Sequence, residues 1–171
     1  MPEGRHVFAG LTVMENLEMG AFLHTNKEEN AALLKKVFQR FPRLEERKNQ
    51  DAATLSGGEQ QMLAMGRALM SRPKLLLLDE HTAALDPATA EKVMDITKTI
   101  VQENNITTMM ITHNLKQSLT TGTRTIMLDS GEIILDLSGE ERKNTTMEDM
   151  IKMYSMKKQK EFDNDRILLS Q

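Results

Sequence analysis

The sequence contains no cysteine and no tryptophan, and it has one tyrosine among 171 residues. Without cysteine the chain forms neither disulfides nor thiolate metal sites, and it has no cysteine nucleophile. Aromatic residues make up 4% of the chain, which is too few for a platform on which nucleobases stack. The 22 basic and 25 acidic residues give a formal net charge of -3, which argues against attachment to nucleic acid by bulk charge.

Long apolar segments are also missing. The apolar run Leu75–Leu78 is far shorter than the ~20 residues that a membrane span needs, and the first six residues lack the apolar stretch of a signal peptide. With 39% hydrophobic and 27% charged residues, the chain can bury a core and stay in solution. We therefore expect a cytoplasmic chain of one domain, or of one large domain with a small appendage.

The first third of the sequence predicts helices with marked N-termini. Thr12 and Glu15 have the spacing of a capping box. Asn26 predicts a second N-cap, before a run of apolar residues at helical spacing that ends ahead of Pro42. Residues 43–54 are polar and charged, and they predict a solvated connection.

After Leu55 the pattern alternates between helix and strand. A helix begins at Ser56, and Leu75–Leu78 is typical of a strand covered on both faces. A helix capped by Asp86 and a strand over 106–112 follow. Strands over 124–128 and 132–137, a helix capped by Thr146 and a charged, disordered tail complete the expected order. This order predicts an α/β fold, with a helical segment before a partly parallel sheet core and a C-terminal hairpin and helix.

Polar residues follow the predicted strands where functional groups collect in parallel sheets. Asp79 and Glu80 end the first strand, where two acids can hold a hydrated Mg²⁺ and polarise a water for phosphoryl transfer. His113 ends the strand over 106–112 and is expected beside Glu80, where a neutral imidazole can hold an attacking water. The alternative is a buried strand that ends in polar residues, with a structural histidine.

The segment Leu55–Gln60 reads LSGGEQ and places two glycines at a helix N-terminus. Free amides and the positive end of the helix dipole attract phosphate there, and Ser56 can donate a hydrogen bond to it. The alternative is an ordinary capping box between Ser56 and Glu59, which needs no ligand. Asp86 likewise has a plain interpretation as the N-cap of the next helix.

Taken in order, LSGGEQ, LLLLDE, ALD (residues 84–86) and ITH (residues 111–113) resemble the nucleotide-binding domain of ABC transporters, a P-loop NTPase fold. The resemblance implies an ATP-binding and ATP-hydrolysing subunit of a bacterial importer, with ATP and Mg²⁺ as cofactors. It implies the following roles: Asp79 binds the metal; Glu80 and His113 are catalytic; and the nucleotide-binding residues are Leu55, Ser56, Gly57, Gly58, Glu59, Gln60, Asp86 and Glu3, the last at the Q-loop position where the family usually has Gln.

No G-x-x-x-x-G-K-[ST] motif occurs, so the loop that cradles the nucleotide phosphates is missing. We therefore expect the C-terminal part of an ABC ATPase, inactive alone and starting at the Q-loop. Its expected division is a helical subdomain over 1–73, the remaining core over 74–156 and a charged tail over 157–171. Residues 2–78 resemble branched-chain amino-acid importer ATPases and the rest resembles another importer group, which predicts a chimera. His81 stands where the family usually has Pro.

The resemblance also implies partners. These are transmembrane permease subunits, which we expect to meet Val7, Phe8 and Leu11, and a second ATPase subunit; no nucleic acid is expected. The chain would then lie peripherally on the inner face of the bacterial plasma membrane. Two alternatives stay open: a non-enzymatic fragment that pairs with a complete subunit, and a soluble ABC ATPase outside transport. The latter carries long coiled coils or a second cassette, and no sustained heptad run is visible here.

Overall fold

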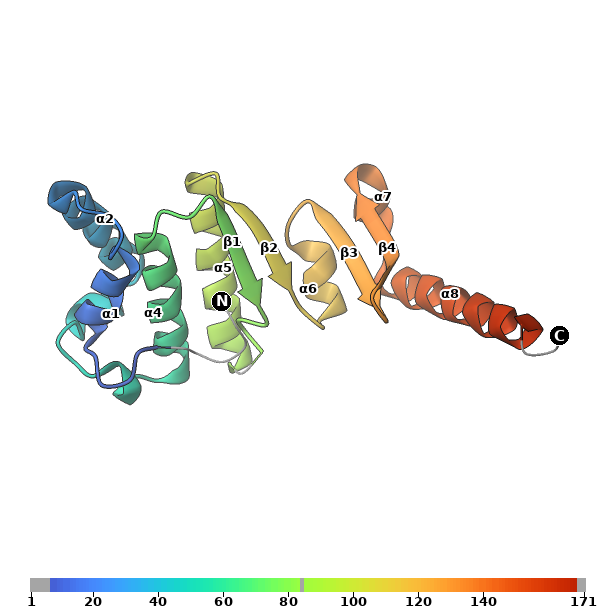
Figure 1. Cartoon of the computed structure of the whole chain (residues 1–171), viewed down its shortest axis with the longest axis horizontal. Coiled ribbons are helices and arrows are strands. Elements are labelled where there is room, and N and C mark those ends of the chain that lie inside the picture. The colour runs from blue at the N-terminus through green and yellow to red at the C-terminus, as the bar shows by residue number, and fades with distance from the viewer. Residues whose placement is uncertain (1–6, 84, 169–171) are drawn as a thin grey trace. The chain divides into compact units, whose positions relative to one another are not determined.

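The computed structural model describes residues 7–83 and 85–168, with the backbone alone for residues 158–168. The chain divides into two compact units, Met1–Ile111 and Thr112–Gln171 (Figure 1). The first unit contains α1 (Val13–Gly20), α2 (Lys27–Arg40), α3 (Pro42–Glu46), a 3-10 turn (Ala52–Thr54), α4 (Gly57–Met70), β1 (Leu75–Asp79), α5 (Pro87–Glu103) and β2 (Thr107–Ile111). The second contains α6 (Leu115–Thr120), β3 (Arg124–Asp129), β4 (Glu132–Ser138), α7 (Gly139–Asn144) and α8 (Met147–Leu168).

The helix starts of the first unit follow the predicted capping residues. The N–H of Glu15 donates to Thr12 Oγ1 over 3.2 Å, and the N–H of Thr12 donates to Glu15 Oε2 over 2.7 Å. Asn26 Oδ1 accepts from the next helix in the same way. The sequence also places apolar residues at helical spacing in this segment, and their side chains are buried; they are Val13, Leu17 and Ala21.

The prediction of a solvated connection over residues 43–54 was wrong. Pro42 ends α2 but also begins α3, because its fixed φ suits the first position of a helix. Leu44 and Ala52 have no exposed surface and belong to the core of the first unit. Polar neighbours in the sequence concealed these two apolar residues.

Each unit carries a sheet that has two strands among the described residues. β1 pairs in parallel with β2, from Leu75 opposite Thr107 to Asp79 opposite Ile111. β3 and β4 form an antiparallel hairpin. The predicted α/β order of a parallel pair followed by a hairpin is therefore confirmed.

One face of the β1–β2 pair is covered and the other is open. Leu76 and Leu78 belong to the same buried cluster as Ile100 of α5. Leu75 and Leu77 are 54% and 51% exposed, so the expectation of a strand covered on both faces fails for this chain. Met109 lies opposite Leu77 in the register and is also exposed. An open apolar face of this kind fits a sheet that lacks further parts of its domain.

The core of the first unit depends on close approach between helices. A Cβ added to Gly20 would lie 2.2 Å from the carbonyl oxygen of Arg67, so the end of α1 touches the backbone of α4. A Cβ added to Gly66 would lie 3.0 Å from Leu17 Cδ2 and from Val37 Cγ1. These contacts leave no space for larger side chains at Gly20 and Gly66, where α1 and α2 pack on α4.

In the second unit, Arg142 of α7 ties the hairpin to α6. Its guanidinium donates to Thr125 Oγ1 and to the carbonyl oxygens of Ser118 and Thr121. α8 continues to Leu168, where we expected a disordered tail. At the start of α8, Met150 is buried and Met147 is exposed. Among the described residues, every helix is too short or too polar to cross a membrane.

Candidate functional site

The carboxyl end of β1 carries the two acids that the sequence singles out. The N–H of Glu80 donates to the carbonyl oxygen of Ile111 over 3.1 Å, which extends the parallel ladder by one residue. Glu80 then takes a φ of 44°, in the left-handed region, and its carbonyl accepts from the N–H of Ala83 over 3.0 Å. A non-glycine residue held in this region stores strain, which is common at functional sites. Asp79 and Glu80 are both partly exposed at this turn.

His81 is the residue of this turn that sequence reasoning treated only as a departure from the usual Pro. It is 6% exposed, and its Nε2 atom has no hydrogen-bond partner among the described residues. Burial lowers the pKa of His81 to about 4, so the imidazole is neutral at pH 7. The turn after the two acids is thus packed around a neutral side chain.

This burial predicts a loss of stability in mild acid. The pKa of His81 is about 4 in the folded chain and 6.5 unfolded, so the unfolded chain takes up the proton first as the pH falls. The stabilisation is present above pH 6.5 and is lost between about pH 6.5 and pH 4. From pH 7 to pH 5, we expect the parent to lose about 2 kcal/mol more unfolding free energy than His81→Gln. Urea denaturation of both proteins measures this; equal losses would contradict it.

The LSGGEQ segment forms the capping box that its alternative interpretation predicts. The Ser56 hydroxyl and N–H donate to Glu59 Oε2 over 2.8 Å and 2.9 Å. Burial raises the pKa of Glu59, but the hydrogen bonds from Ser56 and the charges of Arg47 and Arg43 outweigh it and leave the pKa below its ordinary value. Gln60 donates backwards to the carbonyl of Leu55 over 3.2 Å. These contacts fix the loop, and its binding of nucleotide stays a prediction.

Gly58 brings this loop against the start of α5. A Cβ on Gly58 would lie 2.5 Å from Thr89 Cγ2, so only glycine fits without movement. The side chain of Thr89 and its N–H both hydrogen-bond the Asp86 carboxylate, and these bonds lower the pKa of Asp86. Sequence reasoning missed Thr89, because nothing in its local pattern marks it. Thr89 therefore links two of the predicted motifs, since it packs on Gly58 of LSGGEQ and hydrogen-bonds Asp86.

The predicted residues of the first unit lie toward one end of it. Figure 1 shows the N-terminal ends of α4 and α5 at the same end as the carboxyl ends of β1 and β2. This arrangement follows from the topology, since each helix runs back against the strand that it joins. Glu3 lies outside the described residues. His113 is exposed and belongs to the second unit, so its expected place beside Glu80 stays a prediction.

The acids at β1 suit a divalent cation in part. Mg²⁺ commonly takes one or two protein carboxylates and completes its shell with waters and substrate phosphates. Asp79 offers such a carboxylate at the strand end. Among the described residues, no group of three or more acidic or histidine side chains forms a closed metal cage. The residues therefore fit a metal shared with a phosphate ligand.

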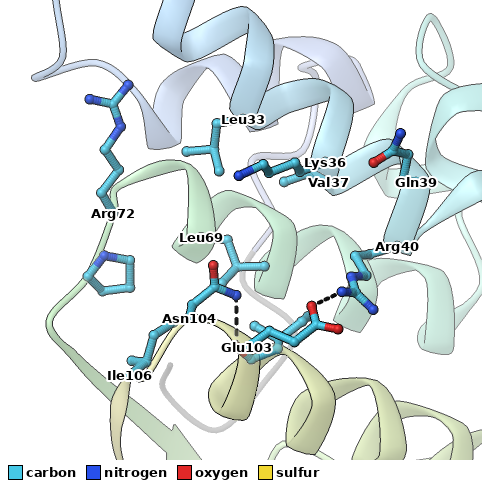
Figure 2. A pocket seen from close by; sticks show the side chains of 12 residues that line it. Leu33, Lys36, Val37, Gln39, Arg40, Leu69, Arg72, Glu103, Asn104 and Ile106 are labelled. Atoms are coloured by element: carbon cyan, nitrogen blue, oxygen red, sulfur yellow. Dashed lines mark hydrogen bonds and ion pairs between the residues drawn. The ribbon is translucent and has the colours of Figure 1, made fainter.

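A separate cavity of about 550 Å³ lies at the opposite ends of the helices. Figure 2 shows it between α2 and the C-terminal ends of α4 and α5. Leu33, Val37 and Ile106 contribute apolar walls. Arg40 pairs with Glu103 across it, and none of the predicted site residues lines it. It is therefore distinct from the predicted nucleotide site.

The fold and these motifs define the class of ABC ATPases. Residues 1–83 match the family model described as ABC transporter. The chain is 46% identical, over 139 residues, to the high-affinity branched-chain amino acid transport ATP-binding protein BraG of Pseudomonas aeruginosa, covering 81% of this chain and 59% of that protein. It is 50% identical over 100 residues to a tyrosine transport ATP-binding protein of Clostridioides difficile, covering 58% of this chain and 40% of that protein.

Solved structures agree with this class. An ATP-binding cassette in a post-hydrolysis dimer with ADP and Pi matches with a TM-score of 0.68 and 29% identity, over 80% of this chain and 60% of that chain. The cassette of an ABC transporter in its ADP conformation matches with a TM-score of 0.69 and 26% identity, over 84% and 62%. Over most of its length the chain is similar to the ATP-binding subunits of ABC transporters. It spans about three fifths of the length of the branched-chain relative.

Proposed function

We propose that this chain is the C-terminal part of the ATP-binding subunit of a bacterial amino-acid importer of the branched-chain type. The observation that carries the proposal is the order of LSGGEQ, Asp79–Glu80 and Asp86 at one end of a single unit. The 46% identity to a branched-chain amino acid transport ATP-binding protein supports the substrate class. On this proposal the subunit lies peripherally at the inner face of the plasma membrane. We also propose that its subdomains divide after residues 73 and 156, and that the chain is a chimera of two importer groups.

The roles of the acids follow from their place at the strand end. Glu80 accepts the proton of the water that attacks the γ-phosphate. The hydrogen bond from its N–H to the carbonyl oxygen of Ile111 holds the backbone that carries this side chain. Asp79 holds Mg²⁺, which when bound neutralises charge on the phosphates. Residues 55–60 face the nucleotide held by a second ATPase subunit. The chain has no phosphate-cradling loop of its own, so it is inactive until that part is supplied.

The first unit exposes large apolar side chains before and after α1. Phe8 is 46% exposed, and at the end of α1 Phe22 and Leu23 are 76% and 87% exposed. Contiguous exposed apolar side chains on a folded domain mark interaction sites, and Phe22 and Leu23 are neighbours in the chain. We assign this surface to a helix of the permease. The sequence pointed to Phe8 but missed Phe22 and Leu23, which fall between two helices.

Phe8→Asp is expected to weaken binding to the permease at least about tenfold, because it replaces an apolar contact with a charge that must be desolvated. Pull-down with the membrane subunits of the P. aeruginosa branched-chain transporter measures this. Leu128→Asp is the control, since Leu128 is 62% exposed on β3. Parental recovery of the permease by Phe8→Asp would place the interface elsewhere. Loss of solubility would make Phe8 a residue of the core.

The proposed function is tested by restoring the missing part. The N-terminal segment of the P. aeruginosa relative, up to the residue aligned with Glu3, is joined to this chain. We expect the hybrid to bind ATP and to hydrolyse it with Mg²⁺, whereas the chain alone does neither. A folded hybrid that binds no ATP would contradict the proposal. ATP binding without hydrolysis would favour the non-enzymatic alternative, which the missing phosphate loop keeps open.

A further inference from the structure

The segment before α1 is tied down by one buried side chain. Asn16 has no exposed surface, and its amide makes a short network with the backbone. Its Oδ1 accepts from the N–H of Phe8 over 2.8 Å, and its Nδ2 donates to the carbonyls of Phe8 and Thr12 over 3.1 Å and 3.0 Å. A buried amide with all these partners fixes the position of Phe8, because any shift leaves a polar group unpaired.

Arg67 joins this network from α4. Its Nη1 lies 3.3 Å from Asn16 Oδ1, and its guanidinium carbon lies 4.4 Å from the centre of the Phe8 ring. Burial lowers the pKa of Arg67, although the side chain remains charged at pH 7. A partly desolvated guanidinium interacts strongly with an aromatic face. A change on the exposed side of the Phe8 ring would therefore alter the interaction between Arg67 and that ring.

α4 connects Arg67 to the LSGGEQ loop. The helix runs without interruption from Gly57 to Met70, with Arg67 in its last turn. Gly20 of α1 touches the backbone of Arg67, and Gly58 touches Thr89. These close contacts leave little free space around either end of α4.

We infer that Arg67 is a positioning residue that couples the exposed face of Phe8 to the LSGGEQ loop at the far end of α4. A partner that covers Phe8 removes water from the Phe8–Arg67 pair, strengthens it and draws on α4. The identity of that partner as a permease helix rests on the proposed function. The coupling itself is a property of the first unit, and it is measured without ATP or permease. Its failure would therefore leave the proposed function untouched.

The test is hydrogen exchange at the amides of Glu59 and Gln60 in the purified chain. Phe8→Ala is expected to speed exchange there at least about threefold, a typical coupling between linked residues. Phe22→Ala is the matched control, since it removes a ring that is 76% exposed, and it should leave these amides unchanged. In an Arg67→Met background, the effect of Phe8→Ala should vanish.

Two further variants separate coupling from general destabilisation. Arg67→Lys keeps a cation near the ring and should retain part of the Phe8→Ala effect. Arg67→Gln keeps a donor for Asn16 but removes the cation, and it replaces Arg67→Met if that variant does not fold. An undiminished Phe8→Ala effect in Arg67→Met or Arg67→Gln would overturn the inference. So would a Phe8→Ala effect spread equally over the amides of α5.

Discussion

Gly58→Ala is expected to lower the free energy of unfolding by about 2 to 3 kcal/mol, the cost of overpacking a tight contact. The new methyl group would lie 2.5 Å from Thr89 Cγ2, well inside van der Waals contact. Thr89 cannot easily rotate away, because its side chain and N–H both hydrogen-bond Asp86. The higher helix propensity of alanine offsets only part of this cost.

Thr89→Ser supplies the matched rescue. Serine removes the methyl group that collides and keeps the hydroxyl that bonds Asp86, so Gly58→Ala with Thr89→Ser should recover most of the lost stability. Thr89→Ser alone should cost less than about 1 kcal/mol, as for one buried methyl group. Chemical denaturation of the four proteins gives the cycle. Equal destabilisation by Gly58→Ala with and without Thr89→Ser would show that the contact with Thr89 is not what requires glycine.

This cycle matters for how a glycine in a motif is interpreted. From the sequence, Gly58 predicts close approach of the backbone to an anion. The structure adds a second reason for a glycine at this position, since its Cα faces Thr89 at the contact between α4 and α5. A contact of this kind joins residues that are 31 positions apart, so no local pattern carries it. Capping residues differ in this respect. Thr12, Asn26, Ser56 and Asp86 act within three residues, and the sequence predicted each of their helix starts.

The burial of four residues was predicted wrongly because it also depends on contacts between residues far apart in the sequence. Leu44 and Ala52 stand among polar neighbours, and only the packing of α3 and the 3-10 turn on the core shows that they are buried. Leu75 and Leu77 look like core residues by their pattern, yet they lie on the exposed face of the β1–β2 pair, which the local pattern does not reveal. Local sequence thus specified where elements begin, and tertiary contacts decided which faces are covered.

Glu80→Gln in the hybrid ATPase is expected to reduce turnover at least about 100-fold, the usual contribution of a general base. The amide has the shape of the carboxylate but cannot accept the proton of the attacking water. ATP binding should persist, because the backbone bond from Glu80 to Ile111 and the turn to Ala83 do not involve the side chain. The nucleotide-bound dimer should therefore accumulate, which size-exclusion chromatography with ATP detects.

Glu91→Gln is the matched control, because Glu91 is an exposed glutamate of α5 and its substitution makes the same chemical change. It should hydrolyse ATP at the parental rate and should not accumulate as a dimer. Hydrolysis by Glu80→Gln at the parental rate would remove Glu80 from its role as base. A loss of ATP binding together with turnover would instead make Glu80 a structural residue of the strained turn, since its φ of 44° requires a side chain that tolerates the left-handed region. Only a fall in turnover with ATP binding retained supports proton transfer by Glu80, because it separates the chemistry from the fold that positions it.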